Sequence, residues 1–154
     1  MKLGVISDTH GLLRPEVIPA LAGVERILHL GDVGDATILM KLKELAPVTA
    51  IRGNVDRRGP CSKLPETDVL LLEGHYVYML HDVHTLHLDP AAAKFSAVLY
   101  GHSHQPGIRR QKGVLYFNPG SCGPRRFHLP VTIGFLTITQ DAVAPEIQHL
   151  NVRS

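Results

Sequence analysis

The chain has 154 residues and a formal net charge of +2, and 44% of its residues are hydrophobic. A chain of this length can bury about two-thirds of the surface that its unfolded form exposes, and we expect one domain over residues 1–154. The net charge is too small to indicate a nucleic acid or an anionic membrane as partner. The longest apolar runs are far shorter than the ~20 residues of a membrane-spanning helix.

The N-terminal residues and the cysteines predict a cytoplasmic protein with no membrane attachment. Residues 1–7 carry one basic residue before a short strand-like run, which is unlike a signal peptide. Cys61 and Cys122 are isolated from each other and form no CxxC pair, which is typical of a reducing compartment.

Strands and helices alternate in the first half of the chain. Residues 14–22 predict a short helix with Pro15 in its first turn. Residues 36–46 predict a clearer helix that is capped by Asp35 and stopped by Pro47. Strands are predicted at 3–6, 25–30 and 48–52. This β-α-β-α-β order indicates a layered α/β domain with right-handed crossovers.

The second half is predicted to be mostly antiparallel β-structure. A hairpin is expected with Gly74-His75 as its two-residue turn, and a short helix is expected near 90–95. The predicted strands are 68–73, 76–81, 97–100, 114–117, 131–139 and 145–152. Together the two halves predict two packed sheets with helices on their outer faces.

Polar residues that can bind metals follow five of the apolar runs. They are Asp8, His10, Asp32, Asn54, His81, His102 and His104. Because the carboxyl ends of parallel strands meet at one edge of a sheet, these side chains can share one cleft. In Asp8-Thr9-His10 and in His102-Ser103-His104, the one-residue separation lets both side chains face the same point. A turn-forming role is the alternative for any single residue, but it does not predict this paired spacing.

The ligand types predict the kind of metal and the reaction. Carboxylate, carboxamide and imidazole groups without thiolates suit Mn, Fe, Co, Ni or Zn. Seven ligands exceed the needs of one tetrahedral ion, which favours two ions that share one aspartate. Two ions about 3.5–4 Å apart can hold a bridging hydroxide that attacks phosphorus, and can clamp the phosphoryl oxygens. We therefore expect hydrolysis of a phosphate ester.

The motif set resembles a known family. Asp8-Thr9-His10, Gly31-Asp32, Gly53-Asn54, His81 and Gly101-His102-Ser103-His104 are similar in order and spacing to the calcineurin-like metallophosphoesterases, over nearly the whole chain. The short length and Asn118-Pro119-Gly120-Ser121 resemble the small branch of bacterial and archaeal phosphodiesterases, which also includes a eukaryotic vacuolar sorting (retromer) subunit.

This resemblance implies a fold, a cofactor and a ligand assignment. The implied fold is a four-layer α/β/β/α sandwich, two β-sheets flanked by helices. The implied cofactor is two divalent ions, with manganese as first choice and Fe, Ni, Co and Zn as alternatives. Asp8, His10 and His104 would hold one ion, and Asn54, His81 and His102 the other. Asp32 would bridge the two ions.

Two departures from the family pattern concern the leaving group. Many relatives carry Gly-Asn-His-Glu, whose histidine helps to protonate the leaving group, whereas this chain has Gly53-Asn54-Val55-Asp56. Valine cannot donate a proton, so catalysis would depend on the metals and favour good leaving groups. Relatives also carry Gly-His after the equivalent of His81, whereas Asp82-Val83-His84 follows here, which makes His84 a candidate for substrate binding.

Other basic residues are weaker candidates. The pairs Arg57-Arg58, Arg109-Arg110 and Arg125-Arg126 are either solvated surface or a rim that attracts phosphate. Arg125 and Arg126 are the best candidates for substrate binding because they follow the Asn118–Ser121 loop. His29 lies within an apolar run and is interpreted as a core histidine that supports the ligands.

The main hypothesis is a metal-dependent phosphodiesterase that acts on a small phosphodiester substrate. One alternative is a non-catalytic metal-binding scaffold for protein interaction, as in the retromer-type relatives. Another is a nuclease acting on RNA or DNA, although an aromatic content of 5% argues against a stacking platform for bases. Small relatives often form dimers, so a homo-oligomer is also an expectation.

Overall fold

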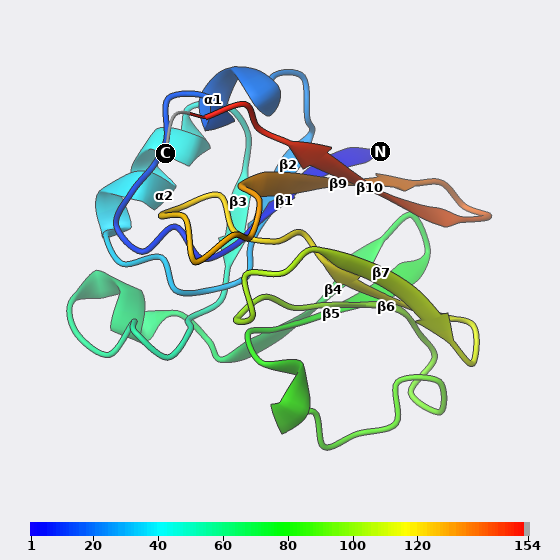
Figure 1. Ribbon diagram of the computed structural model, residues 1–154. Helices are drawn as coiled ribbons and strands as arrows, with labels where there is room; N and C mark the ends of the chain where they lie inside the picture. Colours follow the sequence, from blue (N-terminus) through cyan, green and yellow to red (C-terminus); the bar gives the residue numbers. More distant parts are fainter. Residues whose placement is uncertain (153–154) are drawn as a thin grey trace.

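The computed structural model describes residues 1–152 and shows two five-stranded β-sheets packed face to face (Figure 1). This arrangement confirms the predicted fold class. The last two residues of the predicted domain 1–154 lie outside the described residues. Among the described residues, no helix is long and apolar enough to cross a membrane.

The first sheet contains the parallel strands of the N-terminal half. Its strands are β1 (Lys2–Ile6), β2 (Arg26–His29), β3 (Val48–Ala50), β9 (Thr132–Ile138) and β10 (Val143–His149), in the order β10-β9-β1-β2-β3. Strands β1, β2 and β3 are parallel, and β9 runs antiparallel to both β1 and β10. Helices α1 (Val17–Ala20) and α2 (Ala36–Lys43) cover its outer face (Figure 1).

The second sheet has the same number of strands. They are β4 (Thr67–Leu72), β5 (His75–Leu80), β6 (Phe95–Leu99), β7 (Gly107–Gln111) and β8 (Val114–Asn118), in the order β4-β5-β6-β8-β7. Strands β5, β6 and β8 are parallel to one another. Two 3₁₀ helices, η1 (Pro60–Lys63) and η2 (Val83–Thr85), lie in the loops around this sheet. Its outer layer is mainly the segment that contains η2, so the helical cover is thinner here than on the first sheet.

Both helices are shorter than predicted. In α2 the Asp35 carboxylate accepts a hydrogen bond from the Thr37 amide at 2.9 Å, which satisfies a free N–H of the first turn. The helix ends at Lys43, four residues before Pro47. Helix α1 is a single turn that contains Pro19, which has no N–H to extend it.

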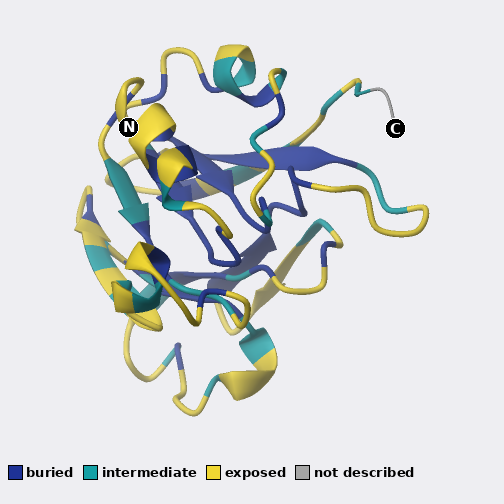
Figure 2. Cartoon of the chain, turned by 90° about the vertical axis from the view of Figure 1, so that its left-hand side faces the viewer, coloured by how far each residue is buried: buried dark blue, intermediate teal, exposed yellow. Residues whose placement is uncertain are grey.

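Alternating residues of both sheets form the main core. It contains Leu3, Val5, Leu28, Leu30, Ile51, Leu72, Val77, Met79, Ala97, Leu99, Leu115, Phe117, Leu136, Ile138 and Val143. A second cluster lies between the first sheet and its helices, and a third lies beneath the segment that contains η2. Figure 2 shows the central strands buried and the outer turns and helices exposed.

Three predicted details were wrong. Residues 90–94 form hydrogen-bonded turns rather than a helix, because Lys94 takes a left-handed conformation (φ 61°) directly before β6. The hairpin turn is Glu73-Gly74, since both residues have positive φ (51° and 83°), as a type I′ turn requires. Strand β7 was missed because most of its residues are exposed and two are arginines.

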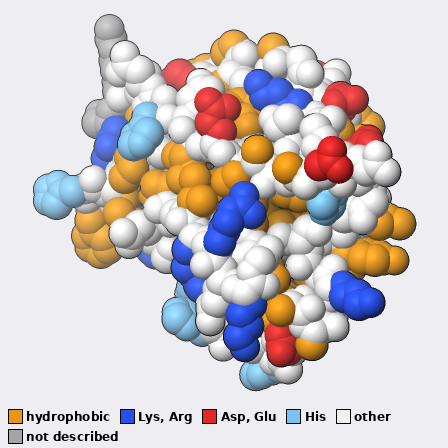
Figure 3. Space-filling view, turned by 90° about the vertical axis from the view of Figure 1, so that its right-hand side faces the viewer, with side chains coloured by type: hydrophobic (Ala, Val, Ile, Leu, Met, Phe, Trp, Pro, Cys, Tyr) orange, Lys and Arg blue, Asp and Glu red, His pale blue; other side chains and the backbone are white. Residues whose placement is uncertain are grey.

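The strand directions divide the molecule into two ends. The carboxyl ends of β1, β2, β3, β5 and β6 meet at one edge, which faces the viewer in Figure 2. The opposite end carries the hairpin turns, and Figure 3 shows hydrophobic, basic and acidic side chains intermingled on it. The edge at the carboxyl ends is where the predicted site residues lie.

Candidate metal centre

The seven candidate ligands come from the loops after five strands. Asp8 and His10 follow β1, Asp32 follows β2, Asn54 follows β3, His81 follows β5, and His102 and His104 follow β6. The fold brings these loops together even though their residues span almost a hundred positions. The predicted convergence of the side chains is therefore present in the structure.

The backbone is strained at these residues. Five of them have positive φ angles, namely Asp8 (60°), His10 (46°), Asp32 (54°), His102 (73°) and His104 (63°). Such conformations cost about 1–3 kcal/mol per residue outside glycine and cluster at functional sites. Only nine described residues other than glycine have positive φ, so more than half of this strain lies at one edge of the sheets.

Asp8, His10 and His104 form the inner group of the centre. Asp8 Oδ1 lies 3.6 Å from His10 Nε2 and 3.5 Å from His104 Nε2. Asp8 is fully buried, and the side chain of His104 is 6% exposed. Their ligand atoms lie close enough together to hold one cation.

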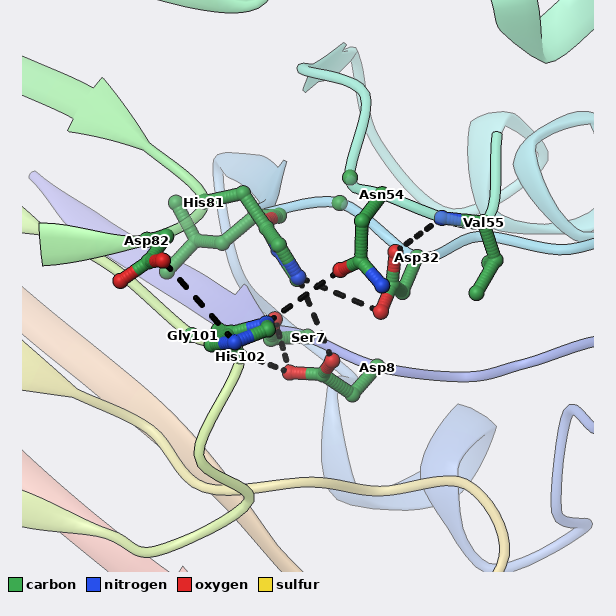
Figure 4. A network of polar contacts seen from close by, with 12 residues as sticks. Ser7, Asp8, Asp32, Asn54, Val55, His81, Asp82, Gly101 and His102 are labelled. Atoms are coloured by element: carbon green, nitrogen blue, oxygen red, sulfur yellow. Dashed lines mark hydrogen bonds and ion pairs between the residues drawn. The ribbon is translucent and has the colours of Figure 1, made fainter. Parts of the chain in front are cut away.

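Asp32, His81 and His102 form a second group beside the first (Figure 4). Asp32 Oδ2 lies 3.2 Å from His81 Nε2 and 3.4 Å from His10 Nε2, so this carboxylate stands between the two groups. His102 Nδ1 lies 3.2 Å from Asn54 Oδ1, which adds the exposed Asn54 to the outer side.

Several buried atoms lack a hydrogen-bond partner among the described residues. They are Asp8 Oδ1, His10 Nε2, His81 Nε2 and His104 Nδ1. A buried polar atom without a partner costs about 1–3 kcal/mol. The first three belong to the groups described above and face a common space. A nitrogen and oxygen donor set of this kind fits first-row divalent ions.

Hydrogen bonds orient the candidate ligands. His81 Nδ1 lies 2.7 Å from the Leu30 carbonyl, which directs Nε2 toward Asp32. Asp8 Oδ2 accepts hydrogen bonds from the Ser7 hydroxyl at 2.7 Å and from the His102 amide at 3.1 Å, which leaves Oδ1 free to face the histidines. The Ser121 hydroxyl donates to the Asp8 carbonyl. The Asn118–Ser121 loop therefore supports the loop that carries Asp8.

The charges of the two groups are coupled. Burial raises the pKa of Asp8, but the neighbouring imidazoles of His10 and His104 outweigh it and hold that pKa well below its usual range. Burial lowers the pKa of His81, but Asp32 and Asp8 outweigh it and raise that pKa above its usual value. The nearby Asp8 carboxylate also raises the pKa of His10. A cation that binds here must displace these protons, so rising pH favours its binding.

Asp56 is a buried residue whose role the sequence reasoning missed. Its carboxylate accepts hydrogen bonds from the amides of Val33, Gly34 and Gly53 at 2.9–3.1 Å. It thereby ties the loop that carries Asp32 to the loop that carries Asn54. Its position in Gly53-Asn54-Val55-Asp56, two residues after the candidate ligand Asn54, could have indicated this role.

His29 is a fully buried histidine, as predicted. Its Nδ1 accepts from the Gly31 amide at 3.1 Å, so Nε2 carries the proton and donates to the Thr9 hydroxyl at 3.0 Å. Burial lowers the pKa of His29 to about 4. This neutral imidazole connects the loops that carry Asp8 and Asp32.

Two hollows flank the centre, and the structure places the predicted substrate residues on or near them. Arg125 and Arg126 line a hollow of about 280 Å³ with His10 and His104. A hollow of about 270 Å³ on the other side is lined by Asn54, His81, His102, Arg52, Glu66, Thr67 and Asp82, among others. His84 lies apart from both, on a third hollow with His102 and Arg109.

Three other arginines of the predicted pairs make contacts within the fold. Arg57 Nε donates to the Asn54 carbonyl at 3.0 Å. Arg109 lies over the Tyr116 ring, 4.1 Å from its centroid, and Arg110 donates to the Val143 carbonyl. These contacts support the solvated-surface interpretation more than a phosphate-binding rim.

Comparisons with known proteins agree with this geometry. A "probable metallophosphoesterase" of Methanothermobacter thermautotrophicus is 39% identical over 133 residues, which cover 79% of this chain and 77% of that protein. The phosphodiesterase YfcE of Escherichia coli is 30% identical over 161 residues, which cover 88% and 87%.

Solved structures show the same fold at lower identity. The structure of an archaeal phosphodiesterase superposes with a TM-score of 0.79 at 24% identity, covering 96% of this chain and all of that chain. Vps29 of Chaetomium thermophilum superposes with a TM-score of 0.78 at 14% identity, covering 97% and 95%. The family model of the calcineurin-like phosphoesterase superfamily domain matches residues 1–141. The chain therefore belongs to the calcineurin-like phosphoesterase superfamily.

Proposed function

We propose that the protein is a divalent-metal-dependent phosphodiesterase with a dinuclear centre. The observation that carries this proposal is the place of Asp32, whose Oδ2 atom lies 3.2 Å from His81 Nε2 and 3.4 Å from His10 Nε2. One carboxylate thus serves two adjoining groups of nitrogen and oxygen donors. That arrangement is what two ions sharing a ligand require.

The residues divide into two sets in this proposal. Asp8, His10 and His104 hold one ion, while Asn54, His81 and His102 hold the other. Asp32 contributes to both ions. When bound, two divalent ions supply ionised water and neutralise charge on the phosphoryl oxygens. Manganese is the proposed metal, with Fe, Co, Ni and Zn as alternatives, because all of them accept imidazole and carboxylate ligands.

The surroundings of the centre suggest the substrate. Arg125 and Arg126 line the hollow beside His10 and give it positive charge for a phosphodiester. Val55 donates its amide to Asp32 Oδ1 at 2.9 Å, and its side chain is an exposed apolar group without a proton to give. His84, which lies near His102, remains a proposed substrate residue. These surroundings support a small phosphodiester with a good leaving group as the substrate. A cytoplasmic location and a homo-oligomer stay expectations from the sequence.

Reconstitution tests this proposal. Protein stripped of metal should bind two equivalents of Mn²⁺ by elemental analysis and then hydrolyse bis(4-nitrophenyl) phosphate. A series of aryl methyl phosphodiesters should show rates that fall steeply as the pKa of the leaving phenol rises, because Val55 supplies no acid. No turnover with any first-row divalent ion would overturn the proposal.

The same measurement addresses the scaffold alternative. A non-catalytic metal-binding protein would take up the ions with full stoichiometry and leave every ester in the series intact. The buried, strained ligand set favours the enzyme, because strain of this kind is retained at reacting sites.

A further inference from the structure

The loop of residues 124–130 carries an aromatic side chain with unusual exposure. Phe127 is 84% exposed, while Phe117 and Phe135 are buried in the cores. Its backbone has a φ of 53°, in the left-handed region. A bulky residue in that region is an outlier, so Phe127 combines an exposed apolar surface with a strained backbone.

The turn around Phe127 would suit a different residue. The Leu129 amide donates to the Arg126 carbonyl at 3.0 Å, which makes Phe127 the second residue of a four-residue turn. A positive φ at that position is normally supplied by glycine, asparagine or aspartate. Neither burial nor backbone preference accounts for phenylalanine here, which points to a role for the ring itself.

The base of the loop is held firmly against the candidate centre. The Arg14 side chain is buried, and its Nε donates to the Gly123 carbonyl at 2.9 Å. A side chain added at Gly123 would collide with the backbone carbonyls of Asp8 and Thr9, so the chain passes directly over the first ligand loop. Ser121 pairs with Val131 and closes the loop at its base. The fold therefore fixes where this loop stands relative to Asp8.

Phe127 directly follows two arginines on the wall of the centre. Arg125 and Arg126 line the hollow of about 280 Å³ that also contains His10 and His104. A cationic wall followed by an exposed ring is the combination that recognises a phosphate joined to a flat, aromatic group.

The hollow on the other side of the centre has different chemistry. Arg52 there is paired with Glu66 at 2.7 Å, and Thr67 and Asp82 add neutral and acidic groups to the wall. An anionic, aromatic part of a substrate is therefore better matched by the side of His10.

We propose that Phe127 is a specificity-determining residue that stacks on the nucleobase of a nucleoside phosphodiester, with Arg126 beside its phosphate. This proposal rests on the proposed phosphodiesterase function and narrows its substrate class. It differs from the expectation, drawn from low aromatic content, that the chain offers no stacking platform for bases. A single exposed ring, next in the chain to the arginines of the hollow, is enough for one base.

A tryptophan reporter tests binding without turnover, because the chain contains no tryptophan. In metal-loaded Phe127→Trp, adenosine 5′-monophosphate should quench the fluorescence in a saturable manner, whereas inorganic phosphate should not. Tyr76→Trp, at a position that is 46% exposed on β5, is the matched control and should show no saturable quenching. Equal responses of the two variants, or no response of Phe127→Trp, would overturn the proposal.

Kinetic specificity supplies the second test. The ratio of kcat/KM for thymidine 5′-(4-nitrophenyl phosphate) to that for methyl 4-nitrophenyl phosphate should fall about 5- to 150-fold in Phe127→Asn, as expected for loss of ~1–3 kcal/mol of stacking. The ratio should be retained in Phe127→Trp and in Leu88→Asn, a control at an exposed residue outside the loop. A proportional loss with both substrates would instead assign Phe127 a structural role.

Stability separates the two roles further. Asparagine tolerates the left-handed conformation, so the thermal midpoint of Phe127→Asn should equal or exceed that of the parent protein. A lower midpoint would show that the ring supports the fold and would contradict the proposal. If no variant hydrolyses any ester but Phe127→Trp is quenched by the nucleotide, the phosphodiesterase proposal and the specificity role fail, while nucleotide stacking at residue 127 is supported.

Discussion

The two sides of the candidate centre differ in burial and in what surrounds them. On the inner side Asp8 is fully buried, and His104 is 6% exposed on a loop pressed against β1. On the outer side the His102 side chain is 45% exposed, and Asn54 is also exposed. Asp32 joins the two sides and is itself 2% exposed.

The fold therefore holds the ligands of the two sides differently. The inner ligands are held by long-range hydrogen bonds, such as the one from Ser121 to the Asp8 carbonyl, so their geometry exists before a cation binds. On the outer side the Leu30 carbonyl holds the buried His81, but His102 and Asn54 contact each other at the solvent-exposed surface. We therefore expect the inner ion to be the more tightly held of the two.

Asp32→Asn should have the largest effect because its carboxylate serves both sides. Loss of one oxygen anion between two ions removes several kcal/mol of charge stabilisation, or about 10³-fold or more in kcat/KM. Metal content by elemental analysis should fall together with activity. Asp141→Asn, at an exposed turn, is the control. Retention of both ions and of full activity by Asp32→Asn would contradict the role of Asp32 as a ligand shared by both sides.

Acidification should destabilise the protein through His29, the buried histidine behind the inner side. The pKa of His29 is lowered to about 4 in the fold, against an ordinary value of 6.5. Between these values the unfolded state binds the proton and the folded state does not, so stability present above pH 6.5 is lost as pH falls toward 4. The contribution lost is about 2–3 kcal/mol near pH 4.5.

Urea unfolding of metal-free protein at neutral and acidic pH measures this loss. His29→Asn should lose less stability on acidification than the parent protein, since it removes the titrating group. His128→Asn, at an exposed position, should match the parent. Identical pH dependence in all three proteins would show that His29 does not contribute as described.

Close packing beside Asp8 gives a smaller effect. A Cβ at residue 101 would lie 2.8 Å from Asp8 Oδ2 and closer still to Ser7 Oγ. Gly101→Ala should therefore destabilise the protein by about 1–3 kcal/mol and weaken metal binding. At Gly107 a Cβ would meet no described atom within 4 Å, so Gly107→Ala is a matched control. Equal thermal midpoints of the two variants would contradict this packing argument.

The difference in ion affinity between the two sides is the smallest expected effect, and chelator competition measures it. His102→Ala and His10→Ala should each lower the stoichiometry from two ions to about one. The ion retained by His102→Ala should bind about tenfold more tightly than the ion retained by His10→Ala, because its ligands are buried and preorganised. The reverse order of affinities would show that burial does not control ion retention here.

Much of the fold and of the candidate site followed from local patterns. Asp8-Thr9-His10 and His102-Ser103-His104 stand at strand ends, and the parallel arrangement of the strands brings such ends together. Those patterns predict that all seven candidate ligands lie at one edge of the sheets. Their role as metal ligands stays a prediction that the experiments above address.

Turn chemistry limited the local predictions. The hairpin was expected to turn at Gly74-His75, but positive φ at Glu73 and Gly74 moved the turn by one residue and placed His75 in β5. The difference mattered for His75, whose ring contacts Ser96 at 2.6 Å rather than pointing into solvent. Strand β7 was missed because an exposed edge strand shows little apolar alternation.

The order of most elements, the ligand types and their spacing could be predicted from the amino-acid sequence, because these are local properties of the chain. Three features came from the folded structure alone: Asp56 ties two ligand loops together, Ser121 holds Asp8, and the Phe127 side chain is exposed. Such facts depend on contacts between segments up to 113 residues apart. Local patterns in the sequence do not specify which distant side chains meet when the two sheets pack.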